Sequence, residues 1–221
     1  MILVDLNQVL ISNLMAQTRG MVDELPDKSM LRHMVLNSLR GYNLKFKHEY
    51  GTIILCADGA NPWRRGIFPN YKHSRRKGRE EDTKDWSSLF KMIGEIREEL
   101  AQNFPYITLH IDGVEADDII AVLVKENYTK EKIMIVSGDK DFIQLHKYEG
   151  VKQYAPIQKK FVEDPDPVKF LHEQIIKGDR SDGVPNILSA DNVFLIKEKQ
   201  RPINKKRLAE WADIENIPLG S

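Results

Sequence analysis

The chain contains 221 residues, of which 41% are hydrophobic, with 33 basic and 33 acidic side chains. That length and composition suit a folded domain with a sizeable core. No apolar run approaches the roughly 18 residues of a membrane-spanning helix, and the N-terminus begins with a strand pattern instead of a signal sequence. We therefore expect a cytoplasmic protein without a membrane partner. The single cysteine, Cys56, excludes an intrachain disulfide and a zinc site built on thiolates.

Short runs of β-branched and other apolar residues alternate along the chain with segments of helical periodicity. The predicted strands cover residues 2–6, 52–57, 107–111, 132–136 and 151–154. The predicted helices cover residues 29–46, 86–100 and 114–126. Strands that alternate with helices indicate an α/β fold, with a mostly parallel central sheet and helices on both faces.

Residues 61–85 interrupt this pattern with prolines and glycines, and we expect a partly flexible loop or arch there. From Arg64 to Arg79 the segment carries seven Lys or Arg side chains and no acid. A charge run is usually a solvated surface, but interleaved aromatic residues such as Tyr71 favour binding of a polyanion by charge and stacking. The predicted domains are an α/β core over 1–164, which includes the arch, and a small helical part over 165–221.

Acidic residues follow the predicted strands at the point where each strand ends. Asp5, Asp58, Asp112 and Asp139 occupy these positions, and the carboxyl ends of parallel strands meet at one rim of a sheet. Asp139 and Asp141 are expected to point the same way, with the intervening lysine facing away. Crowded carboxylates repel one another unless a hard cation neutralises them, which favours a magnesium or manganese site. The alternative for the 139/141 pair is an Asx turn. Asp112 is expected to be a turn or capping residue.

Two further acidic groups lie in turns or at a predicted helix start. Glu115, Asp117 and Asp118 open a helix, where acids also complement the helix dipole, but Glu115 and Asp118 share a face and suit a cation. Asp179 and Asp182 lie within a glycine-bounded turn. Taken alone the segment is only a turn, but together with the other acids it could complete a second metal site. The backbone amides around the adjacent glycine, residue 183, would bind a phosphate.

Other hydrolase chemistries find little support in the chain. It has no phosphate-binding Gly-Lys-Ser/Thr loop and no Gly-x-Ser-x-Gly elbow, and its histidines show no metal-ligand spacing. A phosphoryl transferase of the haloacid dehalogenase type would need a second aspartate where the chain has Asn7.

Six short motifs occur in the order and spacing of a known family along nearly the whole chain. They are Asp5 in the first strand, Ala57-Asp-Gly59, Tyr71-Lys-His-Ser-Arg75, Glu115-Ala-Asp-Asp118, Ser137-Gly-Asp-Lys-Asp141 and Gly178-Asp-Arg-Ser-Asp-Gly-Val-Pro-Asn186. The chain resembles the 5′ nucleases, which include flap endonucleases and the 5′-exonuclease domains of bacterial DNA polymerases. Within them it is most similar to the bacteriophage members with ribonuclease H activity.

The resemblance implies a PIN-like core and a metal-dependent 5′-to-3′ exonuclease and flap endonuclease that removes RNA primers and 5′ DNA flaps in replication. The implied substrates are DNA and RNA–DNA hybrid with a free 5′ end or flap. The implied cofactor is Mg²⁺, as two ions that Mn²⁺ replaces, and the products carry 5′-phosphates. Single-strand-binding and sliding-clamp proteins of the replisome are the implied partners, in the host cytoplasm if a phage encodes the chain.

The resemblance also assigns roles to individual residues. The first metal would be held by Asp5, Asp58, Glu115, Asp117 and Asp139. The second site would be shaped by Asp118, Asp141, Asp179 and Asp182. Catalysis would use Lys72 and Arg75, which offset charge on the phosphate, together with Asp139. Nucleic acid would be bound by Arg64, Arg65, Tyr71, Lys72, Arg75, Arg76, Lys77, Arg79 and Gly183.

Two departures from the family pattern concern the DNA-binding helical part. Residues 186–194 lack the glycines of the family's duplex-gripping hairpin. We also expect the part over 165–221 to be incomplete relative to the family. The alternative function is a non-catalytic, structure-specific DNA-junction binding protein on the same scaffold.

Overall fold

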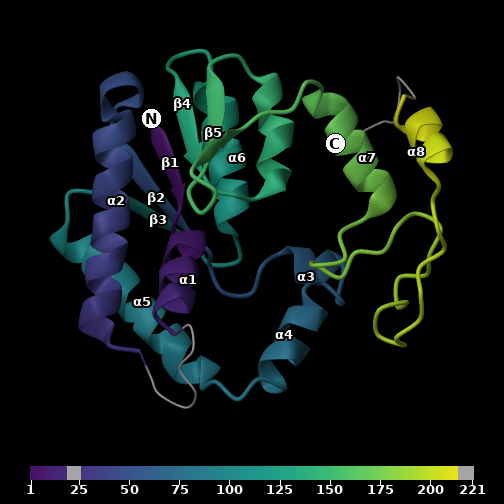
Figure 1. The fold of residues 1–221 in the computed structure, drawn as a ribbon, viewed down its shortest axis with the longest axis horizontal. Helices are drawn as coiled ribbons and strands as arrows, with labels where there is room; N and C mark the ends of the chain where they lie inside the picture. The colour runs from purple at the N-terminus through teal and green to yellow at the C-terminus, as the bar shows by residue number, and fades with distance from the viewer. Residues whose placement is uncertain (19–25, 214–221) are drawn as a thin grey trace. The chain divides into compact units, whose positions relative to one another are not determined.

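The computed structural model describes residues 1–18 and 26–213 (Figure 1). The chain forms two compact units. Unit 1 comprises Met1–Trp63 and Asp82–Glu163, and unit 2 comprises Arg64–Glu81 and Asp164–Ser221. The last eight residues of the predicted helical part, 214–221, lie outside the described residues.

Unit 1 is built on a six-stranded sheet with the strand order β3-β2-β1-β4-β5-β6. Neighbouring strands from β3 to β5 run parallel, and β6 pairs antiparallel with β5. The strands are β1 (Ile2–Asp5), β2 (Ile53–Ala57), β3 (Ile107–His110), β4 (Ile133–Val136), β5 (Val151–Ala155) and β6 (Lys160–Val162). The mostly parallel sheet is therefore confirmed, while the short antiparallel strand β6 was not predicted.

Helices cover both faces of this sheet, as the alternating pattern predicts (Figure 1). On one face lie α1 (Leu6–Gln17), α2 (Lys28–Tyr50) and α5 (Trp86–Asn103). On the other lie α6 (Ala116–Asn127) and the 3₁₀ helix η1 (Lys140–Lys147). Helix α1 was not predicted, and its first residue, Leu6, had been assigned to the preceding strand. In the described part of the chain, no helix is both long and apolar enough to cross a membrane.

The two central strands, β1 and β4, are buried on both faces and fix the core. Along β1, Ile2 and Val4 pack into the cluster under α1, α2 and α5, whereas Leu3 packs into the cluster under α6. All three side chains are 0% exposed. Successive strand residues point to opposite faces of the sheet, so a register shift of one residue would move each of these side chains into the opposite cluster. The register of β1 is therefore tightly specified.

Unit 2 contains the segment predicted as a flexible arch. That prediction is wrong in part, because the segment folds into two short helices, α3 (Arg64–Ile67) and α4 (His73–Glu80). Helices α7 (Pro167–Lys177) and α8 (Lys205–Ala212) are joined by a series of turns and pack side by side (Figure 1). Lys169 Nζ lies 2.7 Å from Asp213 Oδ1, and His172 Nδ1 lies 3.0 Å from the Ala212 carbonyl oxygen.

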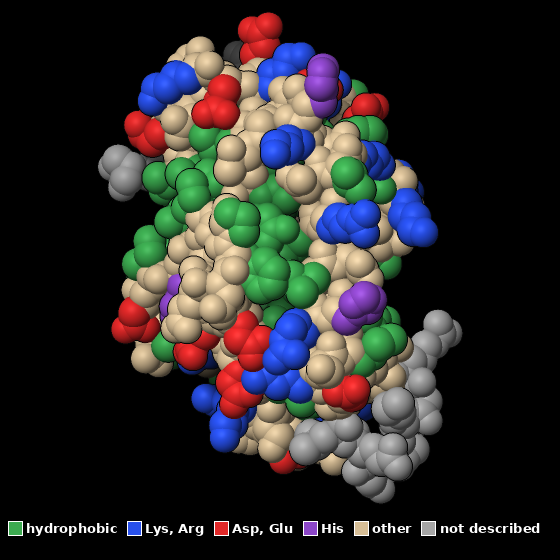
Figure 2. All heavy atoms as spheres, turned by 90° about the vertical axis from the view of Figure 1, so that its left-hand side faces the viewer, with side chains coloured by type: hydrophobic (Ala, Val, Ile, Leu, Met, Phe, Trp, Pro, Cys, Tyr) green, Lys and Arg blue, Asp and Glu red, His purple; other side chains and the backbone are tan. Residues whose placement is uncertain are grey.

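An ion-pair cluster joins α2 to α5 in unit 1. Lys28 Nζ lies 2.6 Å from Glu95 Oε2 and 3.0 Å from Glu99 Oε1, and Arg32 Nε lies 2.5 Å from Glu99 Oε2. The hydrogen bonds from Arg32 and then Lys28 lower the pKa of Glu99 to about 2. Figure 2 shows acidic and basic side chains next to one another on the face that carries these helices, below a band of hydrophobic side chains.

Glu99→Gln should lower the free energy of unfolding at pH 7 by up to about 1 kcal/mol, since solvent screens a pair this near the surface. Because the folded pKa of about 2 lies below the ordinary value of 4.5, the stabilisation is complete above 4.5 and is lost as the pH falls toward 2. Urea unfolding measures the difference in the free energy of unfolding between wild type and Glu99→Gln, and this difference should be smaller at pH 3 than at pH 7. Glu98→Gln, next along the same helix, is the control with little expected effect. A Glu99→Gln difference that is equal at both pH values would contradict this account.

Candidate metal and nucleic-acid site

Asp5 ends the central strand β1 and caps α1, so the fold holds its carboxylate in a buried position. The residue is 9% exposed. Its Oδ1 accepts a hydrogen bond from the Gln8 backbone N–H at 3.0 Å, and its Oδ2 accepts one from Ser137 Oγ at 3.1 Å. Burial is the main cause that raises the pKa of Asp5 to about 6, and the negative charges of Asp58 and Asp139 raise it further. Asp5 therefore lies among like charges in a poorly solvated place.

Asp58 follows β2 and connects the start of α1 with the start of α6. Asn7 Nδ2 donates to Asp58 Oδ2 at 2.8 Å, and the Asp58 N–H donates to Asn7 Oδ1 at 3.3 Å. The Ala116 N–H donates to Asp58 Oδ1 at 2.8 Å. Next to it, a Cβ atom on Gly59 would lie 1.9 Å from the Ile111 carbonyl oxygen, so only glycine fits there.

Glu115 and Asp118 form a capping box at the start of α6. The Glu115 N–H donates to Asp118 Oδ2 at 3.2 Å, and Trp63 Nε1 donates to the same oxygen at 3.1 Å. Glu115 is buried, and Asp117, in the first turn, is half-buried. The capping role that acids at a helix start commonly have is thus present. Asp112 is exposed in a turn, in line with its expected role.

Asp139 and Asp141 do not continue the β4 strand, so the expected strand alternation does not orient them. The chain leaves β4 at Val136, and Asp139 caps η1 by accepting the Asp141 N–H at 2.9 Å. This is the Asx turn that was the alternative prediction. The Asp139 N–H donates to Ser137 Oγ at 3.1 Å, which links it to the hydroxyl that also contacts Asp5.

The structure brings together the acids that follow β1, β2 and β4. The charges of Asp58 and Asp139 both act on Asp5. Burial, and to a smaller degree the charge of Asp5, raises the pKa of the Cys56 thiol to about 12. Within residues 1–18 and 26–213, no three His, Cys, Asp or Glu side chains are placed to hold a metal ion as they stand. The donor set fits a hard cation in its chemistry, since it consists of carboxylate oxygens.

In unit 2, two predicted catalytic cations contact a predicted metal ligand. Lys72 Nζ lies 3.8 Å from Asp182 Oδ2, and Arg75 Nη2 contacts Asp182 Oδ1. The Asp182 carbonyl also accepts the Lys72 N–H at 2.7 Å. Burial raises the pKa of Asp182, against the lowering effect of the two cations. Asp179 shapes this turn, because its Oδ1 accepts the N–H groups of Ser181 and Asp182 at 2.6 and 3.2 Å.

Gly183 closes the same turn next to Asp182. Its φ of +78° favours glycine, and a Cβ atom there would lie 3.0 Å from the Asn70 carbonyl oxygen. The Gly183 N–H points within the turn, since it donates to the Arg180 carbonyl at 3.3 Å. A phosphate would therefore compete with that bond for the amide.

The predicted nucleic-acid side chains of residues 64–79 are largely cationic, with one buried ring between α3 and α4. Tyr71 is 7% exposed, with Lys72 Nζ 4.9 Å from its ring centroid, so the expected stacking of bases on this ring does not suit the conformation. Arg79 Nε donates to the Arg75 carbonyl at 3.1 Å, and burial and the charges of Arg75 and Arg65 lower the pKa of Arg79. The other predicted cations are exposed or half-buried: Arg64, Arg65, Arg76 and Lys77.

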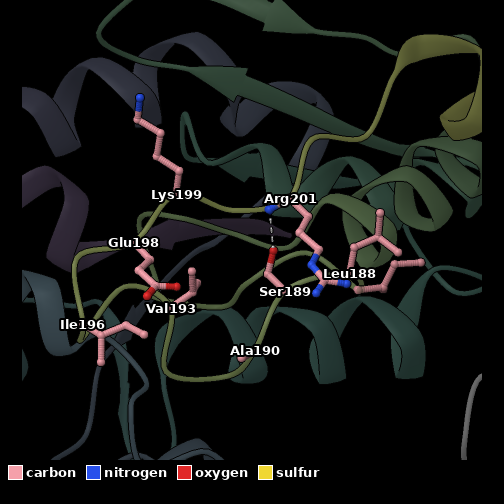
Figure 3. A pocket seen from close by; sticks show the side chains of 9 residues that line it. Leu188, Ser189, Ala190, Val193, Ile196, Glu198, Lys199 and Arg201 are labelled. Atoms are coloured by element: carbon pink, nitrogen blue, oxygen red, sulfur yellow. Dashed lines mark hydrogen bonds between the residues drawn. The ribbon is translucent and has the colours of Figure 1, made fainter.

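The segment that lacks the family's hairpin glycines folds around the buried side chain of Asn186. Asn186 Oδ1 accepts the Leu188 N–H at 3.1 Å and Ser189 Oγ at 2.8 Å, and its Nδ2 donates to the Arg201 carbonyl at 2.8 Å. Figure 3 shows the adjoining pocket, where the Arg201 N–H donates to Ser189 Oγ at 2.9 Å and the Lys199 side chain extends away. The volume of this pocket is about 400 Å³.

Comparisons with known proteins decide the family. Residues 1–173 match the family model described as "5'-3' exonuclease, N-terminal resolvase-like domain". The chain belongs to this 5′-3′ exonuclease family.

Relatives agree with that assignment. Ribonuclease H of Enterobacteria phage T4 is 40% identical over 217 residues, which cover 92% of this chain and 68% of that protein. Flap endonuclease Xni of Shewanella piezotolerans is 31% identical over 167 residues, which cover 70% of this chain but only 61% of that protein. The structure is also similar to a solved complex of a bacteriophage T5 flap endonuclease with DNA and metal ions, with a TM-score of 0.70 and 18% sequence identity. The match covers 94% of the present chain and 82% of the T5 protein. At that identity the likeness supports the fold alone.

Sequence reasoning missed the polar residues that support the acids. Asn7 was noted only because it is not an aspartate, and Gln153, on β5, had no assigned role. Asn7 follows Asp5 in the chain, so its place beside the rim could have been found. Gln153 gives no signal, because the two carbonyls to which it donates lie 14 and 16 residues away, across the β4–β5 connection.

Gly59→Ala should destabilise unit 1 by about 1–3 kcal/mol, because the added methyl group forces the backbone beside Asp58 and Ile111 apart. Gly94→Ala is the matched control: it lies within α5 with nothing within 4 Å of its Cβ position, so it should stabilise by up to about 1 kcal/mol. Urea unfolding of the two variants measures whether each substitution lowers or raises the free energy of unfolding. Equal effects of the two substitutions would contradict the close approach at Gly59.

Proposed function

We propose that this chain is a metal-dependent 5′ nuclease that removes RNA primers and 5′ DNA flaps during replication. The observation that carries the proposal is Asp5, a buried carboxylate that shares the rim of the sheet with Asp58 and Asp139. Such a group needs a proton or a cation to offset its charge. Membership of the 5′-3′ exonuclease family and the relatives named ribonuclease H and flap endonuclease favour the cation.

The proposed cofactor is Mg²⁺, as two ions that Mn²⁺ can replace. The first would be held by Asp5, Asp58, Glu115, Asp117 and Asp139, and the second by Asp118, Asp141, Asp179 and Asp182. The ions would supply an activated water and offset the charge of the phosphodiester, which leaves 5′-phosphate products.

The residues of the chain would prepare this chemistry in three ways. Asn7 and the Ala116 N–H orient the two oxygens of Asp58. Ser137 Oγ donates a hydrogen bond to Asp5 Oδ2, which helps to fix the orientation of the Asp5 carboxylate. Lys72 and Arg75 would offset charge on the scissile phosphate, and their contacts with Asp182 hold them in place until a phosphate competes for them.

Binding of the substrate would rest on the cations of α3 and α4. The proposed substrates are DNA and RNA–DNA hybrid with a free 5′ end or flap. The cluster of Arg and Lys side chains supports backbone contacts that are independent of sequence and sensitive to salt. Single-strand-binding and sliding-clamp proteins are the proposed replication partners.

A non-catalytic DNA-junction binder is the second candidate. Its support is that several of these acids already have structural partners: Asp139 accepts the Asp141 N–H, and Glu115 and Asp118 form a capping box. A nuclease would therefore have to turn carboxylates toward the ion on binding, away from the capping contacts of Asp139 or Glu115 and Asp118.

Asp139→Asn should reduce cleavage of 5′-labelled flap and RNA–DNA hybrid substrates in Mg²⁺ by at least about 100-fold, because it removes a charge from the proposed ion site. EDTA should abolish wild-type cleavage. Asp112→Asn, an exposed turn acid, is the control and should cleave like wild type. Tight junction binding by the wild type without cleavage, in both Mg²⁺ and Mn²⁺, would overturn the nuclease and favour the junction binder.

Lys72→Ala and Arg75→Ala should each lower kcat by about 10²–10³-fold, because each removes a charge proposed to act on the transition state. Lys206→Ala, also in unit 2, should leave kcat unchanged, since Lys206 pairs only weakly with Glu210 at 3.9 Å. Single-turnover kinetics at saturating enzyme measure the rate of the cleavage step in each variant. A pure loss of substrate affinity at unchanged kcat would limit both residues to DNA binding.

A further inference from the structure

Gln153 is a fully buried amide whose partners all belong to the chain around Asp139. It lies on β5 and is 0% exposed. Its Nε2 donates to the Ser137 carbonyl at 2.9 Å and to the Asp139 carbonyl at 2.6 Å. Its Oε1 lies 3.0 Å from His146 Nε2. One side chain thus joins β5, the loop after β4 and the helix η1.

The contacts of Gln153 continue to the carboxylates through Ser137. Ser137 is also 0% exposed. Its hydroxyl donates to Asp5 Oδ2 and accepts the Asp139 N–H, both at 3.1 Å. The Gln153 amide and the Ser137 hydroxyl therefore together hold the backbone of residues 137–139 next to Asp5.

His146 is the third partner of Gln153, and the direction of this hydrogen bond follows from the chemistry of the amide oxygen. The Gln153 oxygen can only accept, so His146 Nε2 carries a proton and donates. Both N–H groups of the Gln153 amide are already used by the two carbonyls. The amide is therefore fully satisfied in a place without solvent, and its orientation is set by three partners.

No other side chain provides this combination of length, donors and acceptor. Glutamate has the shape but no donor for the two carbonyls, asparagine is shorter by one methylene, and methionine fills the volume without hydrogen bonds. A substitution would leave buried carbonyl groups unpaired, which frees the loop to move.

We propose that Gln153 is a positioning residue that holds Asp139 in place beside Asp5 through its bonds to the Ser137 and Asp139 carbonyls. The inference rests on the proposed function, in which these carboxylates hold divalent cations. Outer partners of this kind change metal affinity by about 10- to 100-fold when they are removed. Gln153 contacts neither substrate nor ion and acts through the backbone of the loop.

The test compares Gln153→Met with Leu100→Ala in the full chain. Leu100 is a buried residue of α5 in the hydrophobic cluster on the other face of the sheet, so its variant controls for a general loss of stability. Mn²⁺ affinity is measured by calorimetry, and backbone amide exchange of residues 137–142 by mass spectrometry. Steady-state kcat and KM are measured on a flap substrate, and thermal unfolding midpoints are recorded for both variants.

Gln153→Met should weaken Mn²⁺ binding at least tenfold, speed amide exchange at 137–142 and lower kcat with little change in KM. Leu100→Ala should lower the unfolding midpoint but leave Mn²⁺ affinity and this exchange at wild-type values. Equal behaviour of the two variants would overturn the inference. If the wild type neither binds Mn²⁺ nor cleaves, the proposed function fails, and the exchange comparison alone still decides whether Gln153 holds the loop.

Gln153→Asn serves if Gln153→Met does not fold. Asparagine keeps the amide but is shorter by one methylene, so it is not expected to reach both the Ser137 and the Asp139 carbonyls. The same loss of Mn²⁺ affinity and the same faster exchange are expected. Wild-type affinity and wild-type exchange in Gln153→Asn would overturn the inference.

Discussion

The burial of Asp5 at the end of the central strand is the constraint on which the site depends. The strand is sandwiched between two hydrophobic clusters, so its last residue cannot move toward solvent without moving β1. Parallel pairing on both sides then brings Asp58, after β2, and Asp139, after β4, within electrostatic reach. A fold that stabilises the apolar part of β1 thereby also imposes repulsion between carboxylates at its end.

Capping offsets part of the repulsion between these charges. Asp5 caps α1, Asp139 caps η1, and Glu115 and Asp118 cap α6. The backbone N–H groups at the start of each helix donate to an anion, and the helix dipole favours negative charge there. The structural and the proposed catalytic roles of these acids are therefore compatible: caps stabilise the carboxylates, and a cation would draw some of them away from their N–H partners.

Much of the fold could be predicted from local patterns, because β1, β2 and β4 are short apolar runs and α2, α5 and α6 carry apolar residues at helical spacing. Helix α1 could not, since Leu6, Val9, Leu10 and Leu14 are buried and its other sides carry further apolar residues, so no polar face marks it. Strand β6 has only three residues and forms because β5 offers an edge.

The candidate site was predictable in its residue types but not in its contacts. Strand ends indicated where Asp5, Asp58 and Asp139 would lie. The contact of Arg75 with Asp182 spans 107 positions, and the bonds of Gln153 depend on the exact path of the loop after β4. Such long-range polar contacts are set by tertiary packing, which no local pattern records.

The central claim is that the rim formed by Asp5, Asp58 and Asp139 binds a divalent cation. Anomalous diffraction at the manganese edge from crystals of the wild-type chain soaked in Mn²⁺ tests it most directly. The account predicts a peak bonded to carboxylate oxygens of these residues, with their side chains turned toward it. Peaks only at other surface acids, with the carboxylates of Asp5, Asp58 and Asp139 keeping their present hydrogen bonds, would contradict it.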